Sequence, residues 1–481
     1  MLRFEYVSIP YSLRMKIKHL FILVFLLAVI VRFLLNFSID LIPGAGGGYS
    51  IVQIREIIEE GRLAMSDMPL VFYFNALLVK IIILIFPNCP MDNLIINVYK
   101  IIDCIAFPLL LIPLYRIQKD IFKYSYSKIF LAAVAGFAVL SYAPIELASD
   151  AQKNSIGLIF MTGFIYFFLK YLKGRSVKDV LLSVTMLILT GLAHFGTFTL
   201  SVCFLLLALI IFYRWKAIIP VIGFGIAAVL LIAVFDPSRA KGMFTFWLDS
   251  FSVFLSPRLL FYPHGIFNYI SAFVIIWFII RVLRRNKSAI TTYDRRILLL
   301  FMIFIAILAF PFFGFEYGRR LGLMLFVPQS IVLLVLYPYF SKRAALIIAY
   351  FVLALTIFTA TVRVASPKPM AITGESYSDL MKIKDEIKEP DKTIIFVRHG
   401  LEWWLIWEFR VKIAQPHILV NEELISKYDH IFFLIQKKGE NDFYPGRSSP
   451  FIEPQAPGSA GLVYDSDYFE MYKMRKANDD D

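Results

Sequence analysis

The sequence predicts a mainly helical membrane protein: a polytopic bundle of about eleven transmembrane spans, with juxtamembrane helices and a small extracytoplasmic α/β domain at the C-terminus. Of the 481 residues, 59% are hydrophobic and only 18% are charged, which is far more apolar than a soluble domain. Apolar segments of about 20 residues recur through residues 1–364. After Val364 the composition becomes polar, beginning at "SPKP", so we expect the second domain at residues 365–481.

The spans follow from apolar segments separated by short basic loops. With the N-terminus in the cytoplasm and the first span uncleaved, every loop on that side carries Lys or Arg, as the positive-inside rule requires. Residues 70–86 are also apolar, but a crossing there would invert all later loops, so we expect an interfacial or re-entrant helix. The spans are expected near residues 19–37, 98–115, 129–144, 155–171, 179–195, 198–213, 217–235, 265–282, 296–313, 321–338 and 344–363.

The C-terminal domain shows mixed helix and strand patterns. Residues 375–389 and 402–414 have helical patterns, whereas residues 392–398, 430–436 and 468–474 read as strands. This stretch has no phosphate-binding glycine loop and no nucleophile motif, which favours an accessory domain without chemistry of its own.

The excess of Lys and Arg over Asp and Glu does not indicate a nucleic-acid partner. The formal net charge is +13, but the charges fall in clusters between apolar segments, as expected beside membrane lipids. The three cysteines lack the spacing of metal ligands.

The first loop, residues 38–97, carries the densest set of polar and turn residues. Asp40 is followed by "PGAGGGY", which contains Gly46 and Tyr49, and then by the amphipathic helical pattern "SIVQIREIIEEG". Asp67 and Pro69 precede a second helix, since proline favours a first helical turn. The glycine cluster follows a span rather than a strand and has no P-loop lysine, so it is not a nucleotide site.

This order, a first span and then "PG…Y…IREIIEEG" and a "PL" helix, resembles the GT-C superfamily of membrane glycosyltransferases. The segment "NSIGLIFMTGFIYFFLKYLKGRSVKDVLLSVTMLILTGLAHFGTFTLSVCFLLLALIIF" is similar to the fourth to sixth spans of that family. The resemblance implies a polyprenyl-phosphate-linked sugar donor and an extracytoplasmic glycan, lipid or protein acceptor. It also implies an acidic residue in the first loop that acts as a base or holds a divalent metal. The aspartate expected before Tyr49 is replaced by Gly46, and Asp40 is the nearest substitute.

Candidate residues follow from the chemistry of such a transfer. A hydroxyl nucleophile needs a general base, and a departing phosphate needs positive charge. Asp40 and Asp150 are the predicted catalytic carboxylates. The predicted substrate-binding residues are Glu316, Arg319, Arg320, His194, Tyr49 and Asp67.

Some of these residues also have a purely structural interpretation. Asp150 fits a helix N-cap, His194 fits a helix end, and Glu316 fits an ion pair with the adjacent arginines. Arg32, near the end of the first span, is expected to snorkel toward the interface. Dispersed cations are interpreted as headgroup contacts, namely Arg239, Lys241, Arg258 and His264.

Two other functions remain open. An oligosaccharide polymerase or ligase acts on polyprenyl-linked glycans through arginine and histidine, and the missing loop aspartate favours it. A lipid-linked glycan transporter, or a non-catalytic scaffold related to GT-C enzymes, is the third possibility. A transporter needs polar residues distributed through many spans, whereas these spans are almost entirely aliphatic and aromatic.

Overall fold

The computed structural model divides the chain into two compact units that alternate along the sequence. We call Met1–Val31, Ile105–Leu147 and Lys153–Ala365 the bundle unit, and Arg32–Cys104, Ala148–Gln152 and Ser366–Asp481 the loop–sheet unit. The structure describes residues 17–213 except 45 and 150, residues 219, 222, 223, 226, 265–285 and 290–365, residues 371–437 except 417, 419 and 420, and residues 453–474.

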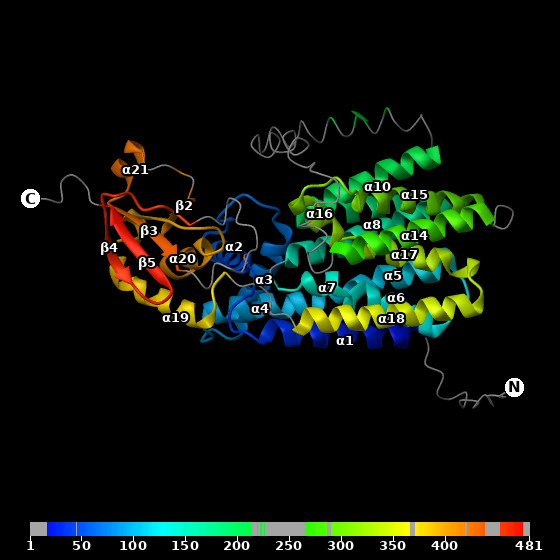
Figure 1. Cartoon of the computed structure of the whole chain (residues 1–481), viewed down its shortest axis with the longest axis horizontal. Helices are drawn as coiled ribbons and strands as arrows, with labels where there is room; N and C mark the ends of the chain where they lie inside the picture. Colours follow the sequence, from blue (N-terminus) through cyan, green and yellow to red (C-terminus); the bar gives the residue numbers. More distant parts are fainter. Residues whose placement is uncertain are drawn as a thin grey trace, which may run out of the picture. The chain divides into compact units, whose positions relative to one another are not determined.

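The bundle unit is built from helices. Three of them, α1 (Ile17–Phe37), α4 (Met91–Ala106) and α8 (Gln152–Gly174), cross the unit boundary. Helices α6 and α18 pack side by side along their length (Figure 1). The elements after α4 are η2 (Phe107–Leu110), α5 (Leu111–Arg116), η3 (Ile117–Phe122), α6 (Lys128–Leu140), α7 (Tyr142–Glu146), α8 (Gln152–Gly174), α9 (Val177–Ala193), α10 (Phe195–Tyr213), α14 (Gly265–Arg285), α15 (Thr292–Leu308), α16 (Phe315–Gly322), α17 (Phe326–Leu336), η5 (Tyr337–Tyr339) and α18 (Lys342–Ala365).

The described residues contain 8 helices or helix runs long and apolar enough to cross a membrane. Each overlaps a span expected from the sequence, and their composition indicates a multi-pass membrane protein. Helices α9 and α15, with 17 residues each, overlap two further expected spans. The span expected at 217–235 lies outside the described residues. The 8 segments are Ile17–Phe37, Met91–Phe122, Lys128–Glu146, Gln152–Gly174, Phe195–Tyr213, Gly265–Arg285, Tyr317–Tyr339 and Lys342–Ala365.

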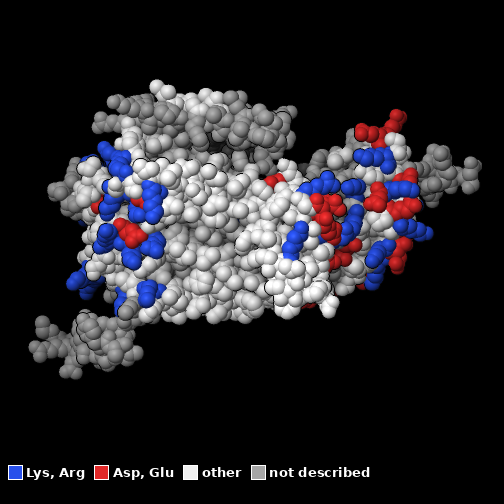
Figure 2. All heavy atoms as spheres, turned by 180° about the vertical axis from the view of Figure 1, so that it is seen from behind, with Lys and Arg blue, Asp and Glu red and all other residues white. Residues whose placement is uncertain are grey.

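The surface of the bundle unit has the charge pattern of a membrane protein. On the face shown in Figure 2, uncharged side chains cover the length of the helices, while Lys and Arg gather at one end. An uncharged band of this kind is compatible with hydrocarbon, and a cationic end is compatible with lipid headgroups.

The loop–sheet unit combines the first loop with a C-terminal sheet. The first loop forms α2 (Gly47–Glu60) and α3 (Leu70–Ile85). The sheet has the strand order β2-β1-β3-β5-β4; β1 pairs parallel with β2 and β3, and β5 pairs antiparallel with β3 and β4 (Figure 1). The C-terminal elements are α19 (Gly374–Lys382), η6 (Ile383–Glu386), η7 (Pro390–Lys392), β1 (Thr393–Phe396), α20 (Glu402–Phe409), β2 (Lys412–Ala414), α21 (Glu422–Lys427), β3 (His430–Gln436), β4 (Ala460–Asp465) and β5 (Phe469–Met474).

One hydrophobic core joins the first loop to the sheet. Ile51 and Ile54 of α2 belong to the same buried cluster as Trp404 of α20 and Phe432 of β3. The first loop and the C-terminal segment therefore fold together, although about 300 residues separate them in the sequence.

Two expected elements end earlier than the sequence patterns indicated. The helix expected over residues 402–414 stops at Phe409, because Arg410 has φ 55° and its amide closes the helix onto the Ile406 carbonyl. The following residues form β2 instead. The helix expected over 375–389 ends at Lys382 and continues only as the turn η6.

Helix α3 covers most of the apolar segment at residues 70–86. It has 16 residues, about 24 Å of helix, which is shorter than the roughly 30 Å hydrocarbon core. One face is buried, including Phe72 and Val79, and the opposite face exposes Leu77 and Leu84. The short length of α3, and its division into a buried and an exposed apolar face, are those expected of a helix that lies at the membrane–water interface.

Candidate functional site

A carboxylate meets a tyrosine hydroxyl at the first turn of α2. The Tyr49 hydroxyl donates to Asp67 Oδ2 at 2.5 Å, and the Met68 amide donates to Asp67 Oδ1 at 2.7 Å. The Gln53 side-chain amide, one turn further along α2, donates to the Tyr49 hydroxyl at 2.8 Å. The structure thus brings together Tyr49 and Asp67, both of which the sequence proposed as substrate-binding residues.

The backbone explains why residue 67 returns to residue 49. Twelve helical residues from Tyr49 to Gly61 advance about 18 Å, and six extended residues from Gly61 to Asp67 cover about 20 Å. Gly61 reverses the chain in the left-handed region, with φ 74°. Gln53 then fixes the returning segment, because its amide donates to the Met65 carbonyl at 3.0 Å and accepts from the Met65 amide at 3.2 Å.

The glycines before Tyr49 allow close packing. A Cβ atom at Gly47 would lie 2.5 Å from the Ile42 carbonyl oxygen, and one at Gly48 would lie 2.7 Å from Cβ of Trp403. Neither distance is sterically tolerable. The cluster is therefore a packing turn that lets the first loop and α20 approach each other.

The C-terminal segment contributes aromatic and ionisable groups beside Tyr49. The Trp403 ring meets the Tyr49 ring edge-on, with the ring centroids 4.8 Å apart. His399 Nδ1 lies 2.5 Å from Glu402 Oε1, and the His399 ring faces Trp403 with centroids 6.2 Å apart. Histidine with a carboxylate partner is a common acid–base arrangement.

Sequence reasoning did not identify this cluster. The signal was present in "HGLEWWLIWEF", where His399 precedes Glu402 by three residues at the start of a helix. Periodicity classed that stretch as an apolar-faced helix and gave no reason to place it beside the first loop.

The other end of α2 is fixed by charge. Arg55 donates to the carbonyl oxygens of Trp407, at 2.5 Å, and Ile406, at 2.9 Å, and so caps the last turn of α20. Burial lowers the pKa of Arg55. Arg410 forms a bidentate pair with Glu59, with both contacts at 2.7 Å. Hydrogen bonding from Arg410 lowers the pKa of Glu59 below its ordinary value.

Of the two predicted catalytic carboxylates, Asp40 and Asp150, the structure describes only Asp40. The Asp40 side chain is exposed, and its backbone carbonyl accepts from Lys100 Nζ at 2.8 Å. Asp150 lies outside the described residues, between Ser149 and Ala151. Asp40 therefore lies in a segment held by Lys100, while its carboxylate faces solvent.

A buried polar network holds the residues just before Asp150. Asp103 is fully buried and accepts from Arg32 Nη2 at 3.0 Å on each oxygen, and from the Ser149 amide at 2.9 Å. Tyr99 donates to the Ser149 carbonyl at 2.7 Å. Ser149 has φ 77°, a strained conformation for a residue other than glycine, and the network fixes it there. The expectation that Arg32 snorkels is wrong, because its side chain is 1% exposed and pairs with Asp103.

The remaining predicted residues belong to the bundle unit. His194 ends α9, its Nδ1 accepts from the Thr197 amide at 3.2 Å, and its carbonyl accepts from the Thr197 hydroxyl at 3.0 Å. The contact of its ring with the Thr197 amide is that of an N-cap residue at the start of α10. Glu316, Arg319 and Arg320 lie on α16, where Arg319 is partly buried and Arg320 is exposed.

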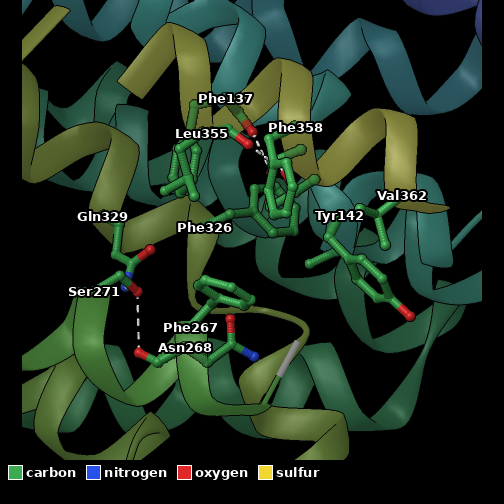
Figure 3. Close-up of a pocket in the computed structure, with 13 residues that line it drawn as sticks. Phe137, Tyr142, Phe267, Asn268, Ser271, Phe326, Gln329, Leu355, Phe358 and Val362 are labelled. Carbon is green, nitrogen blue, oxygen red and sulfur yellow. Dashed lines mark hydrogen bonds between the residues drawn. The ribbon is translucent and has the colours of Figure 1, made fainter. Parts of the chain in front are cut away.

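A small cavity of about 60 Å³ lies beside α16 within the bundle unit. In Figure 3, Gln329 and Ser271 face each other on its polar side, and Phe267, Phe326 and Phe358 line its apolar side. Gln329 Nε2 donates to the Ser271 hydroxyl at 2.9 Å. Asn268 links the cavity to α16, since a Cβ atom on Gly322 would lie 2.9 Å from its Nδ2 atom.

No group of three or more His, Cys, Asp or Glu side chains within the described ranges is placed to hold a metal ion. The carboxylates Asp67 and Glu402 each have protein partners instead. The described donor set therefore does not fit a divalent metal.

No protein-family model matches the chain, and no curated protein sequence matches it.

Proposed function

We propose that this protein is a membrane glycosyltransferase that moves a sugar from a polyprenyl-phosphate donor to an extracytoplasmic glycan, lipid or protein acceptor. The resemblance of the first loop to GT-C enzymes supports this assignment, and the contact between Asp67 and Tyr49 strengthens it. The position where the family has an aspartate is Gly46 in this sequence. The Asp67 carboxylate, from the segment that follows α2, contacts the Tyr49 hydroxyl instead.

The same proposal assigns a topology. About eleven crossings would include α9, α15 and the segment at 217–235 together with the 8 longer helices. The N-terminus and the basic end of the bundle unit then face the cytoplasm, as the positive-inside rule requires. The first loop and the C-terminal sheet lie outside, with α3 at the interface.

The proposed reaction uses Asp67 as the general base. The acceptor hydroxyl oxygen attacks the anomeric carbon of the donor, its proton passes to Asp67, and the bond from that carbon to the phosphate oxygen breaks. Tyr49 orients the carboxylate by donating to Oδ2. Within the bundle unit taken by itself, Arg319 and Arg320 of α16 are the proposed phosphate-binding residues, because one guanidinium group can bind two phosphate oxygens at once. His194 and Glu316 of the same unit stay predicted substrate-binding residues.

Asp40 and Asp150 are the competing bases within this scheme, and mutagenesis separates the three carboxylates. Purified protein is incubated with defined polyprenyl-phosphate sugars, and transfer is followed by mass spectrometry. We expect Asp67→Asn to lower the rate by roughly 10²–10⁴-fold. Glu60→Gln, an exposed carboxylate at the end of α2, is the control and should retain the wild-type rate.

The outcomes are distinct. A normal rate in Asp67→Asn together with a loss in Asp40→Asn or Asp150→Asn would move the base to that residue. Absence of transfer from every single-sugar donor, with activity on lipid-linked oligosaccharides, would identify a polymerase or ligase instead. Absence of any transfer by wild-type protein would contradict the enzyme assignment.

A further inference from the structure

A second cavity, of about 870 Å³, lies at one end of the bundle unit and has no role in the proposed transfer. Four apolar segments end around it. Phe122 closes the run Met91–Phe122, Lys173 lies in the last turn of α8, and Tyr339 ends the segment Tyr317–Tyr339. Asp294 lies in the first turn of α15. Where transmembrane segments end, a cavity lies at the depth of lipid headgroups.

Asp294 is a buried carboxylate without a cationic partner among the described residues. It is 7% exposed, and its Oδ2 atom accepts from the hydroxyls of Tyr124, at 3.1 Å, and Tyr339, at 3.2 Å. Burial, and then the nearby Asp294, raise the pKa of Tyr124, so this hydroxyl stays protonated and continues to donate. Two neutral donors lower the cost of burying the carboxylate, but a buried charge is normally met by an opposite charge.

Asp179, another buried carboxylate of the bundle unit, has a lysine partner and serves as a comparison for Asp294. Asp179 is 4% exposed, as buried as Asp294, and Lys170 Nζ lies 2.9 Å from its Oδ1 atom. The helix ends of the bundle unit therefore include one buried carboxylate with its lysine and one without.

Lys173 supplies a positive charge in the lining of the same cavity. Its Nζ atom donates to the Ile121 carbonyl and lies 6.0 Å from the centroid of the Tyr293 ring. An ammonium group has three donors, so Lys173 can also bind an anion. The lining of the cavity thus includes one negative and one positive side chain.

We propose that this cavity binds the headgroup of a zwitterionic phospholipid that carries a primary ammonium, of the phosphatidylethanolamine type. The ammonium donates to Asp294, next to the rings of Tyr124 and Tyr339, and the phosphate accepts from Lys173. An anionic headgroup would leave Asp294 without a cation, and a simple cation would leave Lys173 without an anion. The site does not depend on the transfer reaction.

The test measures lipid retention by native mass spectrometry of the full-length protein, delipidated and then mixed with phosphatidylethanolamine or phosphatidylglycerol of matched chains. We expect preferential binding of phosphatidylethanolamine, weakened roughly tenfold or more in Asp294→Asn and in Lys173→Met, as for the loss of a charge-assisted hydrogen bond. Asp179→Asn and Lys178→Met are the matched controls and should bind as wild type, because neither residue lines the cavity. A thermal unfolding midpoint for each variant confirms folding, and Tyr124→Phe provides a variant that changes no charge.

Equal retention of the two lipids by wild type, or equal binding by Asp294→Asn and Asp179→Asn, would overturn the assignment. Competition with soluble phosphoethanolamine separates the two sources of the headgroup. Because the acyl chains add apolar contacts, the lipid should bind far more tightly. Equal affinity would show a site for a soluble phosphate–ammonium compound and contradict a lipid site.

Discussion

Asp103 and Asp67 both belong to the loop–sheet unit, and both accept hydrogen bonds from side chain and backbone. Asp103 is completely buried between Arg32, Asn36 and the Ser149 amide. Asp67 is partly exposed and accepts hydrogen bonds from the Tyr49 hydroxyl and the Met68 amide. A carboxylate enclosed by a guanidinium stabilises the fold, whereas a positioned and accessible one can exchange a proton with a ligand.

The largest expected effect on stability is at the enclosed carboxylate. Asp103→Asn leaves the buried Arg32 guanidinium without its carboxylate and should destabilise the protein by about 3–5 kcal/mol. Thermal unfolding in detergent measures the change. A loss no larger than that of Asp67→Asn would remove the distinction between the two carboxylates.

A smaller loss is expected where the glycine turn meets α20. Gly48→Ala places a Cβ atom 2.7 Å from Cβ of Trp403 and should cost about 1–3 kcal/mol by overpacking. Gly374→Ala is the matched control, since no atom lies within 4 Å of its added Cβ. Equal midpoints for the two variants would contradict the packing role of Gly48.

A gain in stability is expected beside Asp103. Ser149→Gly removes the strain of φ 77° while keeping the backbone amide that donates to Asp103, and should stabilise by up to about 1 kcal/mol. Differential scanning fluorimetry detects the shift. A clear destabilisation would show that the Ser149 side chain, rather than its backbone, is needed.

The smallest effect is pH-dependent. Hydrogen bonding to Arg410 lowers the pKa of Glu59 from its ordinary value of 4.5, so the pair stabilises the fold above pH 4.5 and this stabilisation is lost as the pH falls through the lowered pKa. Glu59→Gln should cost less than about 1 kcal/mol at pH 7, because the pair is partly exposed. Unfolding midpoints at pH 7 and below pH 4 measure both values. The difference between wild type and variant should shrink in acid, and a constant difference would contradict this prediction.

The sequence predicted the features that depend on local composition. Apolar length located the 8 described segments that are long enough to cross a membrane, and the amphipathic pattern of residues 50–61 located α2. It did not predict contacts between distant segments. Asp103 lies 71 residues from Arg32, so the guanidinium appeared to need an interfacial position. Trp403 and His399 lie about 350 residues after Tyr49, and no periodicity links them.

Two of the candidate residues selected from the sequence contact each other in the structure. Tyr49 and Asp67 were selected, but Asp40 ranked higher because it lies closer in sequence to the glycine turn. Chain reversal after α2 brings the more distant carboxylate to the hydroxyl, and that reversal depends on the pairing of Gln53 with Met65. Sequence distance was therefore a poor guide to distance in space.

The most direct measurement compares kcat/KM and the unfolding midpoint of Asp67→Asn with those of wild type, using one defined polyprenyl-phosphate sugar. With Asp67 as the general base, kcat/KM falls by roughly 10²–10⁴-fold while the midpoint hardly changes. A rate within about twofold of wild type, or a loss of rate that only follows a loss of stability, would contradict the assignment.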